Sequence, residues 1–77
     1  VDAFDASLMP ATGTPSPGGI SWREAQFILE RCVDGRQVVG LDVVELAPIA
    51  GLHHCDFTAA KLTHLLMGLA VAANSRS

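Results

Sequence analysis

Three acidic side chains in this sequence stand where they could bind a cation. Asp2 and Asp5 follow what reads as the end of a strand, and Glu45 lies at the end of the apolar run QVVGLDVVEL. Carboxylate oxygens suit hard divalent ions such as Mn²⁺ or Mg²⁺. A carboxylate that follows an apolar strand needs a cationic partner, because Glu is almost never fully buried unless it is paired. The sequence therefore offers metal ligands at the aspartates and a cation-binding acid at Glu45.

The spacing alone leaves simpler interpretations open. Aspartates at strand ends and turns are often only solvated, and Glu45 can equally pair with an Arg or Lys of a neighbouring element. A second cluster, formed by His53, His54 and Cys55, suggests zinc. Adjacent ligands do not match the usual spacings of zinc sites, however. We expect these histidines to face solvent.

The elements that must position these acids follow from the turn residues and the apolar periodicity. Pro and Gly residues between positions 6 and 19 predict an ordered loop. Ser21 followed by Glu24 forms a capping box, which starts a helix that Asp34-Gly35 ends. The run from Gln37 to Leu46 predicts a strand, and Asp56 is the expected N-cap of a second helix that continues to the end of the sequence.

This order of elements is a βαβα slice of an α/β domain, which sets the expected place of the acids. A strand that is apolar on both faces is typical of the middle of a parallel sheet covered by helices. Chemistry in such sheets gathers at the carboxyl ends of the strands. We therefore expect Asp2, Asp5 and Glu45 along one edge of the sheet, with the Pro/Gly loop as the wall behind them.

Composition narrows the classes of partner. The 77 residues are 49% hydrophobic and 17% charged, which allows one small domain and suggests that some apolar surface faces material outside this chain. A net charge of −3 without a basic patch argues against nucleic acid. The longest apolar run, residues 62–73, is shorter than the roughly 20 residues that span a bilayer, and no signal peptide is recognisable. Two cysteines, expected as free thiols, favour a cytoplasmic protein without a membrane partner.

The stretch VDAFDASLMPATGTPSPGG resembles the aspartate-rich signature of the ureohydrolases, the family of arginase, agmatinase and formimidoylglutamase. The matching positions are Asp2, Ala6, Pro10, Ala11 and Gly19. GLDVVELAP resembles the second landmark of that family, a strand that ends in Glu before a loop with Pro. The resemblance covers essentially the whole chain and corresponds to the C-terminal part of a ureohydrolase. Residues 1–77 are thus expected to form a single partial domain, the C-terminal part of a ureohydrolase catalytic domain.

The resemblance implies a fragment of a three-layer α/β/α fold with a mainly parallel sheet. It also implies two Mn²⁺ ions in the full-length protein, bridged by a hydroxide that attacks the guanidinium carbon of the substrate. Asp2 would bind one Mn²⁺, Glu45 would hold the guanidinium group, and Thr14 would line the same pocket. Asp5 matches a frequent acid of the family, for which a structural role or one in supporting the metal ligands is expected. No residue of this chain is assigned a catalytic role.

The form DVVELAP is more similar to agmatinases than to arginases, in which Asn often stands where this chain has Ala47. The expected function is Mn²⁺-dependent hydrolysis of a guanidino substrate such as agmatine, releasing urea and an amine in polyamine metabolism. The other metal ligands of the family are absent from this chain, so the isolated piece is expected to be inactive. Arginase or formimidoylglutamase activity and a non-catalytic interaction module stay open as alternatives. By resemblance, the protein would be a homo-oligomer, either a trimer or a hexamer.

Overall fold

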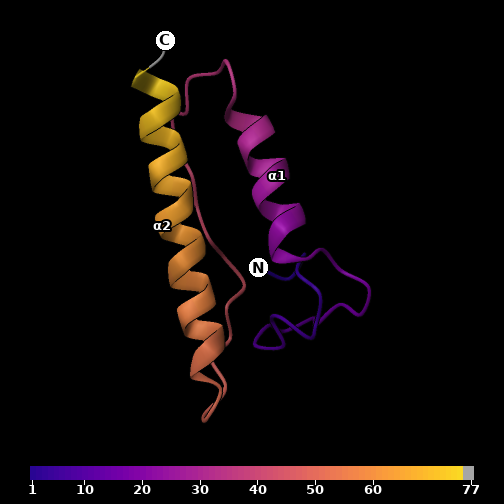
Figure 1. Cartoon of the computed structure of the whole chain (residues 1–77). Coiled ribbons are helices and arrows are strands. Elements are labelled where there is room, and N and C mark those ends of the chain that lie inside the picture. Colours follow the sequence, from indigo (N-terminus) through magenta and orange to yellow (C-terminus); the bar gives the residue numbers. More distant parts are fainter. Residues whose placement is uncertain (76–77) are drawn as a thin grey trace.

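Two helices and the extended segment that joins them make up most of the fold (Figure 1). The computed structural model describes residues 1–75, in which α1 spans Trp22–Val33 and α2 spans His53–Ser75. The helices lie side by side and run in the same direction, and the chain returns along α2 between them (Figure 1). Residues 1–20 form a loop beside the start of α1.

Helix α1 begins and ends where the sequence predicts. The Ser21 hydroxyl accepts a hydrogen bond from the Glu24 N–H at 3.1 Å, and the Glu24 carboxylate accepts one from the Ser21 N–H at 3.0 Å. Both halves of the capping box are therefore present. After Val33 the chain turns at Gly35, whose φ of +69° lies in the left-handed region.

Helix α2 begins at His53, so the prediction of Asp56 as its N-cap is wrong. The Cys55 N–H donates to the Leu52 carbonyl at 3.2 Å, and the Cys55 side chain is fully buried. The burial of Cys55 favours a helix that starts before Asp56. Asp56 therefore lies inside the first turn, where its negative charge interacts favourably with the helix dipole. The last two residues of the predicted helix, 76–77, lie outside the described residues. Neither described helix is long and apolar enough to cross a membrane.

The predicted strands, at Val1–Asp2 and from Gln37 to Leu46, are not formed within residues 1–75. The structure has only two isolated parallel bridges there, Phe4 with Ile20 and Asp5 with Ser16. Residues 37–49 run as an extended segment that is interrupted at Glu45, and within residues 1–75 no second segment pairs with them far enough to form a ladder. Val43 and Leu46 pack against the core, whereas Val39 is 93% exposed.

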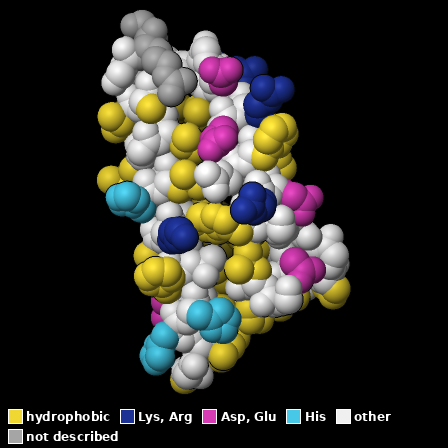
Figure 2. Space-filling model, viewed as in Figure 1, with side chains coloured by type: hydrophobic (Ala, Val, Ile, Leu, Met, Phe, Trp, Pro, Cys, Tyr) yellow, Lys and Arg dark blue, Asp and Glu magenta, His cyan; other side chains and the backbone are white. Residues whose placement is uncertain are grey.

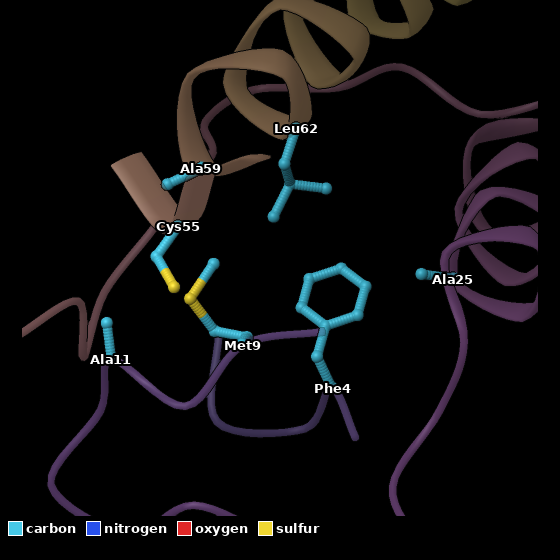
Figure 3. Close-up of a cluster of buried hydrophobic side chains, with 7 residues drawn as sticks. All are labelled: Phe4, Met9, Ala11, Ala25, Cys55, Ala59 and Leu62. Atoms are coloured by element: carbon cyan, nitrogen blue, oxygen red, sulfur yellow. The ribbon is translucent and has the colours of Figure 1, made fainter. Parts of the chain in front are cut away.

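A small hydrophobic core joins the loop to both helices (Figure 3). Its buried members are Phe4, Met9, Ala11, Ala25, Cys55, Ala59 and Leu62. The ring of Phe4 points toward Leu62 and stacks on Trp22, with centroids 6.2 Å apart and planes inclined by 10°. Hydrophobic side chains show at the seam between the helices (Figure 2), where the Lys61 ammonium lies 5.4 Å from the centre of the Trp22 ring. The core thus fixes the loop against the helices.

Candidate metal and substrate site

Asp5 holds the two ends of the Pro/Gly loop together. Its carboxylate accepts hydrogen bonds from the Ser7 N–H at 2.9 Å, from the Ser7 hydroxyl, and from the Gly18 N–H at 2.8 Å. The Ser7 hydroxyl, then the Ser7 and Gly18 N–H groups, hold the pKa of Asp5 below its ordinary value of 3.8. The acid is thus satisfied within the loop, as the expected structural role requires.

Gly19 is required at its position because two backbone segments approach closely there. A Cβ at Gly19 would lie 2.7 Å from the Ala3 carbonyl oxygen and 2.8 Å from the Asp5 nitrogen. The backbone pairs at this crossing: the Ile20 N–H donates to Ala3 at 2.9 Å, and the Asp5 N–H donates to Ile20 at 2.9 Å. The return of the loop toward the start of the chain therefore depends on a residue without a side chain.

Asp2 and Thr14 meet across this loop. The Thr14 hydroxyl donates to the Asp2 carboxylate at 3.3 Å, and both side chains are exposed. Thr14 is held from behind, since its N–H donates to the hydroxyl of buried Thr12 at 3.1 Å. Two of the three residues implicated by the ureohydrolase resemblance are thus in contact, although twelve positions separate them.

A backbone hydrogen bond brings the residue before Glu45 next to the residue before Asp2. The nitrogen of Val1 donates to the Val44 carbonyl at 2.8 Å, so Asp2 and Glu45 each follow one member of a bonded pair. On the other side, the Ala47 N–H donates to the Ala11 carbonyl at 2.7 Å. The backbone segments next to Asp2 and Glu45 are thus adjacent, but no sheet edge is formed within residues 1–75, and a shared edge for Asp2, Asp5 and Glu45 stays a prediction.

The backbone of Glu45 is in a strained conformation. Its φ is +73°, and among the described residues it is the one non-glycine with positive φ. Such a conformation costs an ordinary residue about 1–2 kcal/mol and persists only where the surroundings enforce it. The hydrogen bonds at Val44 and Ala47 flank Glu45 and supply that constraint. Strained residues cluster at functional sites, which is consistent with a substrate-binding acid.

The described residues do not form a metal centre by themselves. Nowhere in residues 1–75 do three His, Cys, Asp or Glu side chains gather closely enough to hold an ion. Asp2 offers one exposed carboxylate, which suits Mn²⁺ by ligand type but is too few for a site. The chain therefore fits a dinuclear manganese centre only as the contributor of one ligand.

The histidines do not form a zinc site within residues 1–75. His53 and His54 are exposed as expected, but they lie in the first turn of α2 and not in a loop. The Cys55 sulfur contacts a ring nitrogen of His54 at 3.5 Å, while the thiol itself is buried. His64 is also exposed, and Figure 2 shows histidine side chains at the surface.

The sequence does not predict the roles of two residues, one of which holds the loop at Thr14 and the other the start of the extended segment. Thr12 is a buried polar residue, and its hydroxyl accepts the Thr14 N–H. A threonine hydroxyl often binds the backbone N–H two residues later in the chain. The spacing of the two threonines in TGT could therefore have indicated this role. Asn74 binds Val38 with both ends of its carboxamide, at 2.8 Å to the N–H and 3.1 Å to the carbonyl. Nothing in the local pattern around Asn74 indicates that pairing.

Comparison with known proteins identifies relatives of several activities. A protein of Synechocystis sp. named N(1)-aminopropylagmatine ureohydrolase is 44% identical over 68 residues, which cover 88% of this chain and 22% of the relative. An agmatinase of Pyrococcus horikoshii is 38% identical over 69 residues, 90% of this chain and 24% of the relative. An arginase of Eremothecium gossypii is 49% identical over 53 residues, 69% of this chain and 13% of the relative.

The chain spans less than a quarter of the length of these curated relatives. No solved structure matches it. The sequence model of the Arginase family matches residues 1–69, which include Asp2, Thr14 and Glu45. With that match over most of its length, the chain belongs to the arginase family.

Proposed function

We propose that the protein containing this chain hydrolyses a linear guanidino compound such as agmatine, releasing urea and an amine. In this proposal Asp2 is a Mn²⁺ ligand, and Glu45 and Thr14 contact the substrate. The observation that carries it is the 3.3 Å contact between Thr14 and Asp2, beside the segment in which Glu45 is held. The contact supports a common site for Asp2 and Thr14, and the proposal adds the side chain of Glu45 to it.

The chemistry of these side chains suits a guanidinium substrate. A carboxylate such as that of Glu45 accepts charge-assisted hydrogen bonds from the planar N–H groups of a guanidinium, and two parallel bonds also fix its orientation. The Thr14 hydroxyl adds a neutral partner and already donates to Asp2. Two bound Mn²⁺ ions would supply a water ionised near neutral pH. The residues of this chain would therefore mainly bind and orient the substrate.

The names of the relatives support the general class more than one substrate. They comprise ureohydrolases of aminopropylagmatine, agmatine and arginine by name. An arginase is matched over the same 90% share of this chain as the agmatinase, so coverage does not choose the substrate. We place agmatine and its N-substituted forms first because the form DVVELAP is more similar to agmatinases than to arginases, and we propose polyamine metabolism as the setting.

The rest of the site would come from sequence outside these residues. The proposal treats residues 1–77 as the C-terminal part of a catalytic domain with the three-layer α/β/α arginase fold, in which residues 37–46 form a strand of the sheet. The remaining metal ligands would then lie on other parts of that domain. A trimeric or hexameric assembly and a cytoplasmic location stay predictions.

The test is urea release by the full-length protein from agmatine, N(1)-aminopropylagmatine and arginine, with and without added Mn²⁺. Asp2→Asn should lower the Mn²⁺ content of the purified protein. Glu45→Gln should retain Mn²⁺ and raise KM by at least about tenfold, because a charged hydrogen-bond acceptor contributes about 1.5–3 kcal/mol. Glu30→Gln, an exposed acid on α1, is the matched control and should behave as the wild type.

The outcomes separate the alternatives. Urea from arginine alone would indicate an arginase. Normal Mn²⁺ binding without urea from any guanidino compound would favour a formimino substrate. A full-length protein that binds no Mn²⁺ would overturn the proposal in favour of a non-catalytic module.

A further inference from the structure

Among the residues of the loop, Asp5 makes the largest set of hydrogen bonds. Its carboxylate binds Ser7 and Gly18, and its backbone binds Ile20, Leu8 and Met9. All of these partners lie within the first twenty residues. The carboxylate is therefore committed to the shape of the loop and is not available to a ligand.

The span that carries Thr14 is held at two places. At its start, the Ala11 carbonyl accepts the Ala47 N–H at 2.7 Å. At its end, the Asp5 carboxylate accepts the Gly18 N–H at 2.8 Å, and the Ala6 N–H donates to the Ser16 carbonyl at 3.0 Å. Thr14 lies between these two anchors and within four residues of each.

We propose that Asp5 is a positioning residue that sets the approach of Thr14 to Asp2 and to the substrate. This inference rests on the proposed function, because it gives Thr14 a substrate to contact. Thr14 is exposed and its hydroxyl contact with Asp2 is long, at 3.3 Å, so this contact alone does not hold the loop in place. The orientation of Thr14 then depends on these anchors and on the Thr12 hydroxyl that accepts its N–H, and Asp5 supplies the side-chain contact at the end of the span.

Asn has the size of Asp but lacks its charge, which makes Asp5→Asn the informative variant. The Asn side chain keeps one acceptor oxygen and presents an NH₂ group to donors on its other side. The N–H groups of Ser7 and Gly18 donate to different oxygens of Asp5, so they cannot both keep their bonds to a side chain with one oxygen. Ser7→Ala is the milder companion, since it removes the hydroxyl donor and leaves the Gly18 contact intact.

A double-mutant cycle in the full-length protein tests whether Asp5 acts through Thr14. The four proteins are the wild type, Asp5→Asn, Thr14→Ala and the double variant, compared by kcat/KM for urea release at saturating Mn²⁺. We expect Asp5→Asn to lower kcat/KM by about tenfold when Thr14 is present and by less than about twofold when it is absent. Ser7→Ala should show the same pattern with a smaller effect. Equal losses in both backgrounds would mean that Asp5 only stabilises the fold, and would overturn the inference.

Hydrogen exchange of residues 10–18 gives a second readout that does not depend on activity. Asp5→Asn should speed exchange at Thr14 and Gly18 by at least about tenfold, while exchange in α1 stays unchanged. Unchanged exchange at Thr14 would overturn the positioning role even in an active enzyme. A wild type that releases no urea would overturn the proposed function, and the exchange data would still decide whether Asp5 orders the Thr14 span.

Discussion

In the loop of residues 1–20, backbone and side chains satisfy one another. The Asp5 carboxylate binds three donors, the strand-like crossing at Gly19 adds backbone pairs, and Phe4 and Met9 are buried. In the extended segment of residues 37–49, Val39, Leu41, Val44 and Ile49 are exposed. Hydrogen bonds join that segment to Val1, Ala11, Leu52 and Asn74. The conformation of the loop is therefore stabilised by contacts within residues 1–20, whereas the conformation of the extended segment depends on contacts with other parts of the protein.

Loss of Phe4 should be the largest effect, because Phe4 attaches the loop to the helices. It is 4% exposed and stacks on Trp22. Phe4→Ala should destabilise the chain by about 3–5 kcal/mol, most of the stability of a domain this size. Phe27→Ala is the matched control, since Phe27 is 62% exposed, and should change stability by less than about 0.5 kcal/mol. Urea unfolding followed by circular dichroism measures both. Equal losses would mean that the loop is not anchored by Phe4.

Gly19→Ala should be the next largest effect, because it acts on the crossing that closes the loop. The added methyl group would meet backbone atoms of Ala3, Phe4 and Asp5, none of which can move as a flexible side chain does. We expect a loss of about 1–3 kcal/mol. Gly13→Ala lies in the same loop with no atom within 4 Å of the added Cβ, and should be neutral by comparison. Thermal unfolding of the two variants compares them, and a harmless Gly19→Ala would contradict the crossing.

Val39→Thr tests whether the extended segment is completed by other parts of the protein. In this chain Val39 is 93% exposed, so the substitution should be nearly neutral in the 77-residue piece. In the full-length protein, a strand covered on both faces would bury the new hydroxyl at a cost of about 1–3 kcal/mol. The two unfolding free energies give the comparison directly. No loss in the full-length protein would mean that this face stays open and that the predicted central strand is wrong.

The smallest effect concerns acid stability and involves Asp5. Its pKa in the folded chain lies below the ordinary 3.8, so the folded state favours the charged carboxylate. The resulting stabilisation is present above pH 3.8 and is lost as the pH falls through the folded pKa. Asp5→Asn should therefore flatten the decline in unfolding free energy at acid pH, and the effect should be modest because the group is exposed to solvent screening. The same decline of unfolding free energy with falling pH in the wild type and in Asp5→Asn would contradict the lowered pKa of Asp5.

The features predicted correctly from the sequence are those that depend on near neighbours in the chain. Ser21 and Glu24 are three residues apart and form the capping box, and Gly35 ends α1 through its own backbone freedom. The start of α2 was predicted too late because burial of Cys55 in the core decides it, and the local pattern around Asp56 does not contain that information.

The strand from Gln37 to Leu46 depends on neighbours that the described chain does not supply. Its β-branched composition correctly indicates an extended backbone, but a strand also needs a second segment for its hydrogen bonds. The candidate site divides in the same way. The contact of Asp2 with Thr14 is formed within the loop, whereas the position of Glu45 rests on bonds at Val44 and Ala47.

The carboxamide of Asn74 offers Val38 the same donor and acceptor as a peptide group of an adjacent strand. Residues 36 positions apart are thereby joined, so fraying of the last described turn of α2 exposes the backbone at the start of the extended segment. Any truncation at the C-terminal end of α2 therefore has to take the Asn74–Val38 hydrogen bonds into account. A cut placed before residue 74, in what looks like a dispensable helix end, removes both of these hydrogen bonds to Val38 and frees the start of the extended segment.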